Sequence, residues 1–185
     1  MRGVIWYQGE SNVDRATQYQ RLFPGMIQDW RRRWGQGDFS FYWVQIAPFG
    51  YSGDTGQAAR LREAQSMTAS LPATGQAVIM DLGNPSNIHP GHKDQVGYRL
   101  ALHALAKDYG QEVVCESPSA SLLEFTKSRV VISFDHAEGL ELRGQGNHRF
   151  TIAGADHVFH PAEVEIEGNQ ITVRSSSVAE PLAVR

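Results

Sequence analysis

Phe41-Tyr-Trp-Val-Gln-Ile-Ala47 is the stretch that decides the fold. Its residues are almost all aromatic, aliphatic or β-branched, which is typical of a strand buried on both faces of a parallel sheet. Pro48 and a glycine-rich loop follow it and end the strand. The sequence therefore predicts a buried strand over residues 41–47.

Strand-like and helix-like patterns alternate on both sides of this strand. Pro24 lies inside one of the helical patterns and should kink or split that helix, whereas Gly110 closes the last one. Strands that alternate with helices imply an α/β fold with a parallel sheet and right-handed crossovers. The expected strands cover residues 4–7, 41–47 and 76–81, and the expected helices cover residues 19–30, 58–71 and 92–109.

The pattern changes after Gly110. Short segments rich in β-forming residues follow one another, and Glu167-Gly-Asn-Gln170 reads as a hairpin turn. We expect two domains, residues 1–111 with the α/β pattern and residues 112–185 as a small antiparallel β domain. The expected strands of the second domain cover residues 129–134, 149–153, 162–166 and 170–174.

Composition excludes several kinds of partner. The 17 basic and 20 acidic residues are nearly balanced, so neither nucleic acid nor a membrane surface is an expected partner. No apolar stretch approaches the length of about 20 residues that spans a bilayer. Cys115 has no second thiol for a disulfide or a shared metal, and we read it as a small buried hydrophobe.

The candidate chemistry lies in loops that follow the expected strands, because ligands of open α/β sheets bind beyond the carboxyl ends of the strands. His89 in the loop of residues 81–90 could act as a general base, or it could be a loop histidine that caps a turn. Two histidine pairs, at residues 89 and 92 and at residues 157 and 160, lack the neighbouring cysteine or acidic pattern of a zinc site. No metal or other cofactor is expected.

The loop Gln8-Gly-Glu-Ser-Asn12 is the second candidate. Its amide groups could donate to a developing oxyanion, with Gln8 as the donor. Alternatively, the loop is a polar strand end in which Asn12 or Asp14 caps the next helix. Ser11 lacks the glycine-flanked pattern of a nucleophilic serine.

Several motifs in a fixed order resemble the sialate O-acetylesterases, which are SGNH-type hydrolases related to acetylxylan esterases. The resemblance covers nearly the whole chain, including the β region. The motifs are Trp6-Tyr-Gln-Gly-Glu-Ser-Asn12, Gln28-Asp-Trp-Arg31, Val44-Gln-Ile-Ala-Pro48, Leu61-Arg-Glu-Ala-Gln65, Ile88-His-Pro-Gly-His-Lys-Asp-Gln-Val-Gly97 and Phe150-Thr-Ile-Ala-Gly-Ala-Asp156.

The resemblance implies roles for individual residues. His89 would be the catalytic base and Gln8 the oxyanion donor. Asn87 stands where many members of the family carry aspartate, so the orienting carboxylate must come from elsewhere, and Asp81 is the nearest candidate. The residues expected around the substrate are Gly9, Glu10, Asn12, Arg62 and Asn87, and Gln65 would either face the pocket or brace it.

The resemblance also implies a reaction and an architecture. The expected substrate is an O-acetylated sugar such as sialic acid, cleaved through an acyl-serine intermediate in a periplasmic or secreted protein. The chain lacks the Gly-Gln-Ser-Asn-like block that carries the nucleophile in the family. We therefore expect a partial flavodoxin-like, SGNH-type three-layer sandwich without its first strands, followed by a truncated antiparallel β module.

Two further expectations follow. Without its upstream neighbours, the strand over residues 3–8 would be exposed and could pair with a second copy in a homodimer. The alternative to an esterase is a noncatalytic carbohydrate-binding remnant in which Trp43, Phe49 and Tyr51 hold a glycan.

Overall fold

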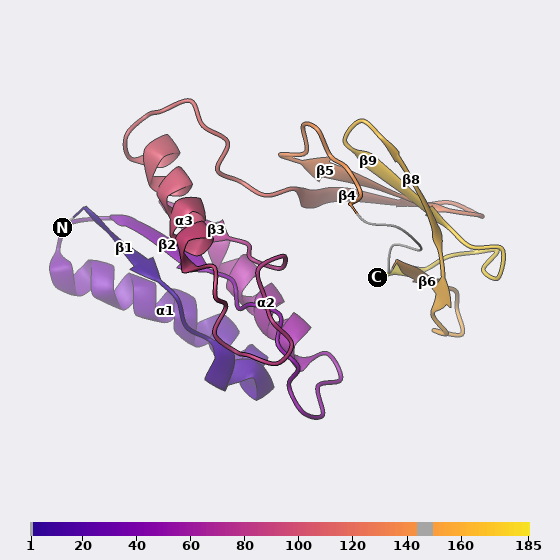
Figure 1. The fold of residues 1–185 in the computed structure, drawn as a ribbon, viewed down its shortest axis with the longest axis horizontal. Helices are drawn as coiled ribbons and strands as arrows, with labels where there is room; N and C mark the ends of the chain where they lie inside the picture. The colour runs from indigo at the N-terminus through magenta and orange to yellow at the C-terminus, as the bar shows by residue number, and fades with distance from the viewer. Residues whose placement is uncertain (1, 144–149) are drawn as a thin grey trace. The chain divides into compact units, whose positions relative to one another are not determined.

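The computed structural model describes residues 2–143 and 150–185, and Figure 1 shows its ribbon. The chain divides into two compact units, Met1–Glu116 and Ser117–Arg185. The division falls in the stretch where the sequence pattern changes.

The first unit is built on a parallel sheet in the order β1-β2-β3. All five residues of the middle strand β2 are buried. The strands are β1 Gly3–Trp6, β2 Ser40–Val44 and β3 Thr74–Ala77, and the helices are η1 Glu10–Arg15, α1 Ala16–Trp34, α2 Gln57–Met67, η2 Thr68–Ser70 and α3 Lys93–Lys107. Among the described residues, none of these helices is both long and apolar enough to cross a membrane.

Helices cover both faces of this sheet. Successive side chains of a strand point to opposite faces, so β2 contributes to two separate cores. Phe41 and Trp43 pack with apolar residues of α1 and α2, whereas Tyr42 and Val44 pack with those of α3. The three-layer α/β arrangement expected from the sequence is confirmed.

Most elements have bounds somewhat different from the expected ones, and two differences have a clear physical reason. The third strand begins at Thr74 and ends at Ala77, earlier than expected. Among the described strands it pairs with β2 alone, and that ladder ends with the bond from Gln45 N to Ala77 O. Pro24 lies inside the single helix α1 and does not split it. Proline removes only one intrahelical hydrogen bond, and Phe23 and Ile27 anchor the helix in the core on either side.

The described part of the second unit contains two antiparallel sheets around one core. Gly168 in a left-handed conformation and Asn169 form the turn between β8 and β9, as the hairpin motif predicted. Residue 149, at the start of one expected strand, lies outside the described residues. The sheets have the orders β4-β5-β9-β8 and β10-β6-β7, with β4 Ser119–Phe125, β5 Val130–Asp135, β6 Thr151–Ala153, β7 His160–Pro161, β8 Glu163–Glu167, β9 Gln170–Arg174 and β10 Ala183–Val184.

Strand β4 was not expected from the sequence. All seven of its residues are exposed. No buried face therefore requires the alternation of apolar and polar residues by which a strand is recognised in a sequence. It is an edge strand that pairs with β5 in antiparallel register. Main-chain pairing rather than side-chain burial therefore forms this strand.

Candidate functional site

The loops after the three parallel strands meet at the carboxyl edge of the sheet. The amide of Gly50, in the loop after β2, donates to the carbonyl of Pro85, in the loop after β3, at 3.0 Å. The ammonium group of Lys93 lies 4.5 Å from the ring centroid of Tyr7, which is a cation–π contact between the start of α3 and the end of β1. The segments that carry His89 and Gln8 therefore leave the same edge of the sheet and are joined next to Tyr7.

The side chain of Gln8 is held from two sides. The hydroxyl of Tyr19 donates to Gln8 O at 3.3 Å and to Gln8 Oε1 at 3.4 Å. Gln8 Nε2 donates to Asn12 Oδ1 at 2.8 Å. A carboxamide nitrogen carries two N–H groups, so one of them remains for a ligand.

The alternative role of this loop, in which Asn12 or Asp14 caps the next helix, is wrong. Within the described residues, neither η1 nor α1 has a side-chain cap, and their N-cap positions are Gly9 and Arg15. Asn12 instead orients the carboxamide of Gln8.

Gly9 and Gln65 fix the backbone of the same loop. Gly9 has φ of 149°, and a Cβ at this position would lie 2.9 Å from Ile46 Cγ2. Gln65 is fully buried in α2, and its Nε2 donates to Gln8 O at 3.2 Å while its Oε1 accepts from Ile46 N at 2.9 Å. Gln65 therefore braces the loops after β1 and β2 from the core and does not face a pocket.

His89 lies exposed in the loop between β3 and α3. Its backbone amide donates to Asn87 Oδ1 at 2.9 Å, so Asn87 shapes the turn that presents the histidine. No residue that the structure describes forms a hydrogen bond with the imidazole ring. Both ring nitrogens thus remain for a substrate or another catalytic group.

Asp81, the expected orienting acid, forms an ion pair with Arg99. Its two carboxylate oxygens accept from Arg99 Nη1 and Nη2, each at 2.6 Å. Arg99 holds the pKa of this carboxyl below its usual range. A guanidinium matches a carboxylate with two parallel donors, which is why Asp81 pairs with Arg99. The pair fastens the start of the His89 loop to α3.

The charges of Glu10 and Arg62 shift the pKa of Tyr51 in opposite directions. Burial raises the pKa of Tyr51, the charge of Glu10 adds to the increase, and Arg62 opposes it. Burial lowers the pKa of the Arg62 guanidinium, while Asp54 and Tyr51 oppose that shift. Glu10, Tyr51 and Asp54 also line a small cavity of about 240 Å³. These residues could contact a polar substrate beside the Gln8 loop.

The structure corrects the aromatic set of the noncatalytic alternative. Trp43 is fully buried, and its Nε1 donates to Gln76 Oε1 at 2.9 Å, so it cannot hold a glycan. Phe49 and Tyr51 lie in the loop after β2 and pack edge to face, with ring centroids 4.9 Å apart.

Two residues of the site were not identified from the sequence. The sequence predicts Tyr19 only as the start of a helix, and Lys93 appears there only within a motif. Their contacts with Gln8 and Tyr7 join residues far apart in the chain, so local spacing gives no signal for them.

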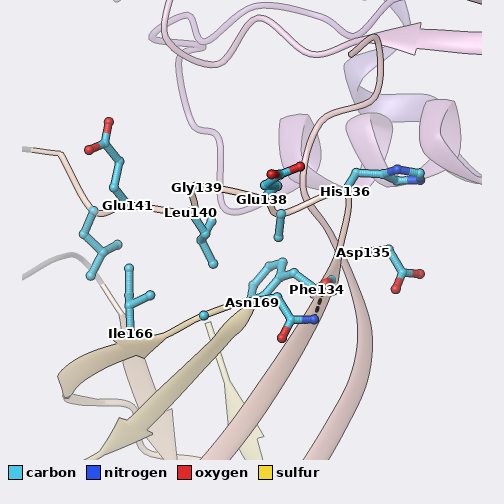
Figure 2. Close-up of a pocket in the computed structure, with 12 residues that line it drawn as sticks. Phe134, Asp135, His136, Glu138, Gly139, Leu140, Glu141, Ile166 and Asn169 are labelled. Carbon is cyan, nitrogen blue, oxygen red and sulfur yellow. Dashed lines mark hydrogen bonds between the residues drawn. The ribbon is translucent and has the colours of Figure 1, made fainter. Parts of the chain in front are cut away.

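A larger hollow, of about 1230 Å³, lies in the second unit. Figure 2 shows Leu140 and Ile166 pointing toward the space beside the turn at Asn169, whereas the carboxylates of Glu138 and Glu141 point away from it. The hollow contains none of the candidate catalytic residues. We therefore place the candidate site in the first unit.

The first unit is thus a three-layer α/β domain with a fixed amide donor and a histidine loop at the carboxyl edge of its sheet. A family model described as carbohydrate esterase, sialic acid-specific acetylesterase matches residues 1–107. The chain belongs to this family.

Individual relatives agree with the family match. Sialate O-acetylesterase of Mus musculus is 30% identical over 173 residues, which cover 83% of this chain and 32% of the mouse protein. The Homo sapiens sialate O-acetylesterase is 30% identical over 174 residues, which cover 83% of this chain and 33% of the human protein. The chain spans about a third of the length of these relatives.

A solved structure is similar over the whole chain. The crystal structure of a carbohydrate acetylesterase from Xanthomonas citri has a TM-score of 0.94 and 47% sequence identity, covering 100% of this chain and 44% of that chain. The 185 residues thus resemble a part of a longer carbohydrate acetylesterase chain.

Proposed function

We propose that this chain forms the histidine and oxyanion-donor part of a carbohydrate O-acetylesterase site that removes acetyl groups from sugars such as sialic acid. The observation that carries the proposal is the fixed carboxamide of Gln8, held by Tyr19 and Asn12 at the sheet edge from which the His89 loop also leaves. A preorganised donor at that position suits the tetrahedral oxyanion of acyl transfer.

In the proposed reaction, His89 removes the proton from a serine hydroxyl as the hydroxyl attacks the acetyl carbonyl. Gln8 donates its remaining N–H to the oxyanion, and His89 then protonates the departing sugar oxygen. A water molecule, activated by the same histidine, releases acetate from the acyl-serine. Asn87, Asp81 and Arg99 act as positioning residues because they hold the histidine loop.

The nucleophilic serine is proposed to lie outside these 185 residues. The chain has no Gly-Gln-Ser-Asn-like block, and Ser11 lies exposed in η1. Glu10, Asn12 and Arg62 would surround the sugar, with Gly9 giving the loop its shape. The two units are proposed to be part of an esterase domain and an adjoining β domain.

A serine-directed phosphonate tests this proposal, because it forms a stable adduct only where a base and an oxyanion hole act on a hydroxyl together. We expect no adduct on the 185-residue chain. Adding the segment encoded upstream should produce labelling on a serine of that segment, together with release of acetate from O-acetylated sugars. Changing His89 to alanine in the longer protein should abolish both.

Two outcomes would contradict the proposal. An adduct on Ser11 would move the nucleophile into this chain. Glycan binding by the longer protein without acetate release would support the noncatalytic alternative, with Phe49 and Tyr51 as its contacts.

A further inference from the structure

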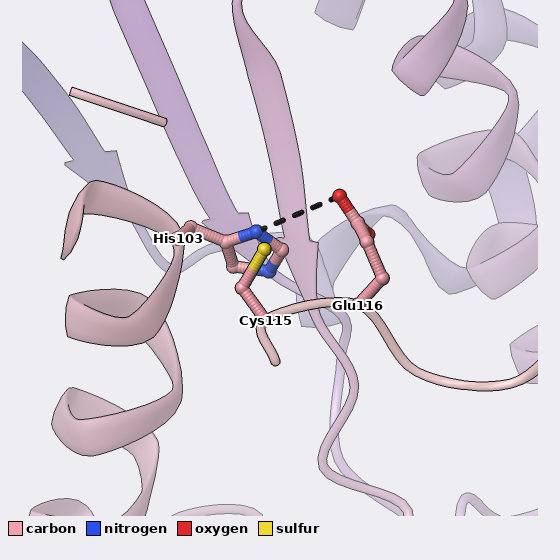
Figure 3. Close-up of side chains that lie close together, drawn as sticks. All are labelled: His103, Cys115 and Glu116. Atoms are coloured by element: carbon pink, nitrogen blue, oxygen red, sulfur yellow. Dashed lines mark ion pairs between the residues drawn. The ribbon is translucent and has the colours of Figure 1, made fainter. Parts of the chain in front are cut away.

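We propose that His103, Cys115 and Glu116 form a zinc site at the opposite end of the first unit from the esterase site. The ligand atoms of these three side chains all lie within 4.8 Å of one another. Figure 3 shows the imidazole of His103 on α3 facing Cys115 and Glu116 on the segment that follows the helix. The site is independent of the proposed esterase activity.

His103 is the observation that points to a ligand. Its side chain is 1% exposed, and within the part of the chain that the structure describes neither Nδ1 nor Nε2 makes a hydrogen bond of normal geometry, although the main chain of Gln76 and the Glu116 carboxylate lie nearby. A buried polar atom without a partner is costly, and a native protein rarely leaves both nitrogens of an imidazole in that state. A metal ion bound to one nitrogen would remove part of this cost.

The ring is fixed in place. It stacks on Tyr42 of β2, with centroids 5.6 Å apart. The ring also contacts Gly75 of β3. A side chain at position 75 would bring its Cβ within 2.6 Å of His103 Nδ1, so only glycine leaves room for the ring. A preoriented histidine is what a metal site requires, because less freedom is lost when the ion binds.

The donors lie slightly farther apart than in an occupied zinc site. His103 Nδ1 lies 3.9 Å from Glu116 Oε1. Zinc binds nitrogen at about 2.0–2.1 Å and sulfur at about 2.3 Å, so two donors of a tetrahedral site lie roughly 3.3–3.7 Å apart. A small movement of the segment that carries Cys115 and Glu116 closes the site, and water takes the fourth position.

Two of the three donors supply negative charge to the ion. Zinc binding converts the Cys115 thiol to a thiolate and releases one proton, with no change of oxidation state. The thiolate and the Glu116 carboxylate then offset the two charges of the ion, and the Lys107 ammonium leaves the group with one net positive charge. Lys107 Nζ lies 2.5 Å from Glu116 Oε1. This is the same oxygen that faces His103 Nδ1, so zinc binding turns the carboxylate to bring its other oxygen to the ion while Oε1 keeps Lys107.

The position of the site suggests what the ion does. His103 contacts the first half of β3, and Lys107 donates to Thr74 O at 2.8 Å, so the group lies at the edge where the strands begin. Residues 111–118 have no regular structure. Zinc would therefore fasten the end of this irregular segment to α3, immediately before the chain enters the second unit.

Calorimetric titration of the metal-free 185-residue chain with Zn²⁺ tests the site. We expect one ion per chain with a dissociation constant of about 1 µM or tighter. Changing Cys115 to serine should weaken binding by about a hundredfold or more, and Glu116→Gln should weaken it less. Both residues lie in the irregular segment, so these variants avoid the buried His103, whose replacement could unfold the domain.

Cobalt gives a second readout. Co²⁺ bound by a thiolate shows a sulfur-to-metal charge-transfer absorption in the near ultraviolet, which should be present in the original chain and absent in Cys115→Ser. The control is the double change His89→Ala and His92→Ala, which removes the exposed histidine pair and should leave zinc affinity unchanged. Substoichiometric zinc, affinity that survives Cys115→Ser, loss of binding in the histidine control, or cobalt binding without the charge-transfer band would each overturn the proposal.

Discussion

Gln65 in α2 donates a hydrogen bond to the main-chain carbonyl of Gln8 at 3.2 Å, although the two residues are 57 positions apart. The same carboxamide accepts a hydrogen bond from the amide of Ile46 at 2.9 Å. One buried side chain thus ties together the loops that leave β1 and β2. The position of the Gln8 carboxamide depends on the packing of a helix that carries no proposed catalytic group.

Changing Gln65 to leucine should destabilise the first unit by about 2–3 kcal/mol, because the buried amide of Ile46 and the carbonyl of Gln8 would lose a partner. Urea denaturation of the 185-residue chain, followed by circular dichroism, measures the change. The control is Gln28→Leu on the exposed part of α1, which should change stability by less than about 0.5 kcal/mol. Equal effects of the two substitutions would contradict the bracing role.

Gly9→Ala should destabilise the chain by about 1–3 kcal/mol. Its backbone has a positive φ, and the new Cβ would meet Ile46 Cγ2 at 2.9 Å and Gln65 Nε2 at 3.1 Å. Gly97→Ala is the matched control, because Gly97 lies inside α3 with open space around it. That change should stabilise the chain by about 0.5–1 kcal/mol. The two substitutions are thus expected to shift the denaturation midpoint in opposite directions.

Gln8→Glu in the catalytically complete protein should reduce kcat by about 100- to 1000-fold, with KM little changed. The substitution keeps the size of the side chain but replaces the N–H donors with an oxygen, which would repel an oxyanion. Acetate release from an O-acetylated sugar measures the effect. Gln28→Glu is the control and should retain full activity. A large rise in KM with unchanged kcat would show that Gln8 only binds substrate.

Asp81→Asn should lower stability near neutral pH by less than about 1 kcal/mol, because the Asp81–Arg99 pair is partly exposed to solvent. Arg99 lowers the pKa of Asp81 in the folded state, so the pair stabilises the fold above the ordinary aspartate pKa of about 3.9. This contribution should disappear as the pH falls through the lowered folded-state pKa. Denaturation of both proteins at a series of pH values should show their difference shrinking in acid.

A difference that stays constant down to the lowest pH would contradict the assigned role of the ion pair. Asp14→Asn provides the comparison. Asp14 is exposed and forms no ion pair within the described residues, so its substitution should have little effect on stability near neutral pH.

The α/β core follows from the sequence because its signals are local. The apolar run around Trp43 predicts a buried strand, and the flanking periodic patterns predict its helices. The hairpin at Gly168 and Asn169 follows from turn chemistry in the same way. Strand β4 could not be predicted, because its exposed side chains carry no burial pattern.

The site was predictable only in part, because only some of its features have a local signal in the sequence. Strand ends identify the loops that carry Gln8 and His89. The partners that hold these loops belong to other elements, as the contact between Tyr19 and Gln8 and the pairing of Asp81 with Arg99 show. The proximity of His103 and Cys115 likewise depends on how the irregular segment after α3 folds back toward that helix. Such contacts require the tertiary structure.

The last prediction concerns the edge of the parallel sheet. Strand β1 pairs with β2 on one side, and Ile5 on this strand is 70% exposed. An apolar strand edge with unpaired main-chain groups recruits another strand, and a charged side chain on the edge opposes this pairing. The 185-residue chain should therefore self-associate as its concentration rises, and Ile5→Lys should shift it toward the monomer. Leu22→Lys is the matched control, because Leu22 on α1 is 67% exposed but does not lie on the sheet edge. Multi-angle light scattering across a concentration series measures the mass of each protein. A monomer at every concentration, or an equal response to both lysine substitutions, would show that β1 does not mediate association.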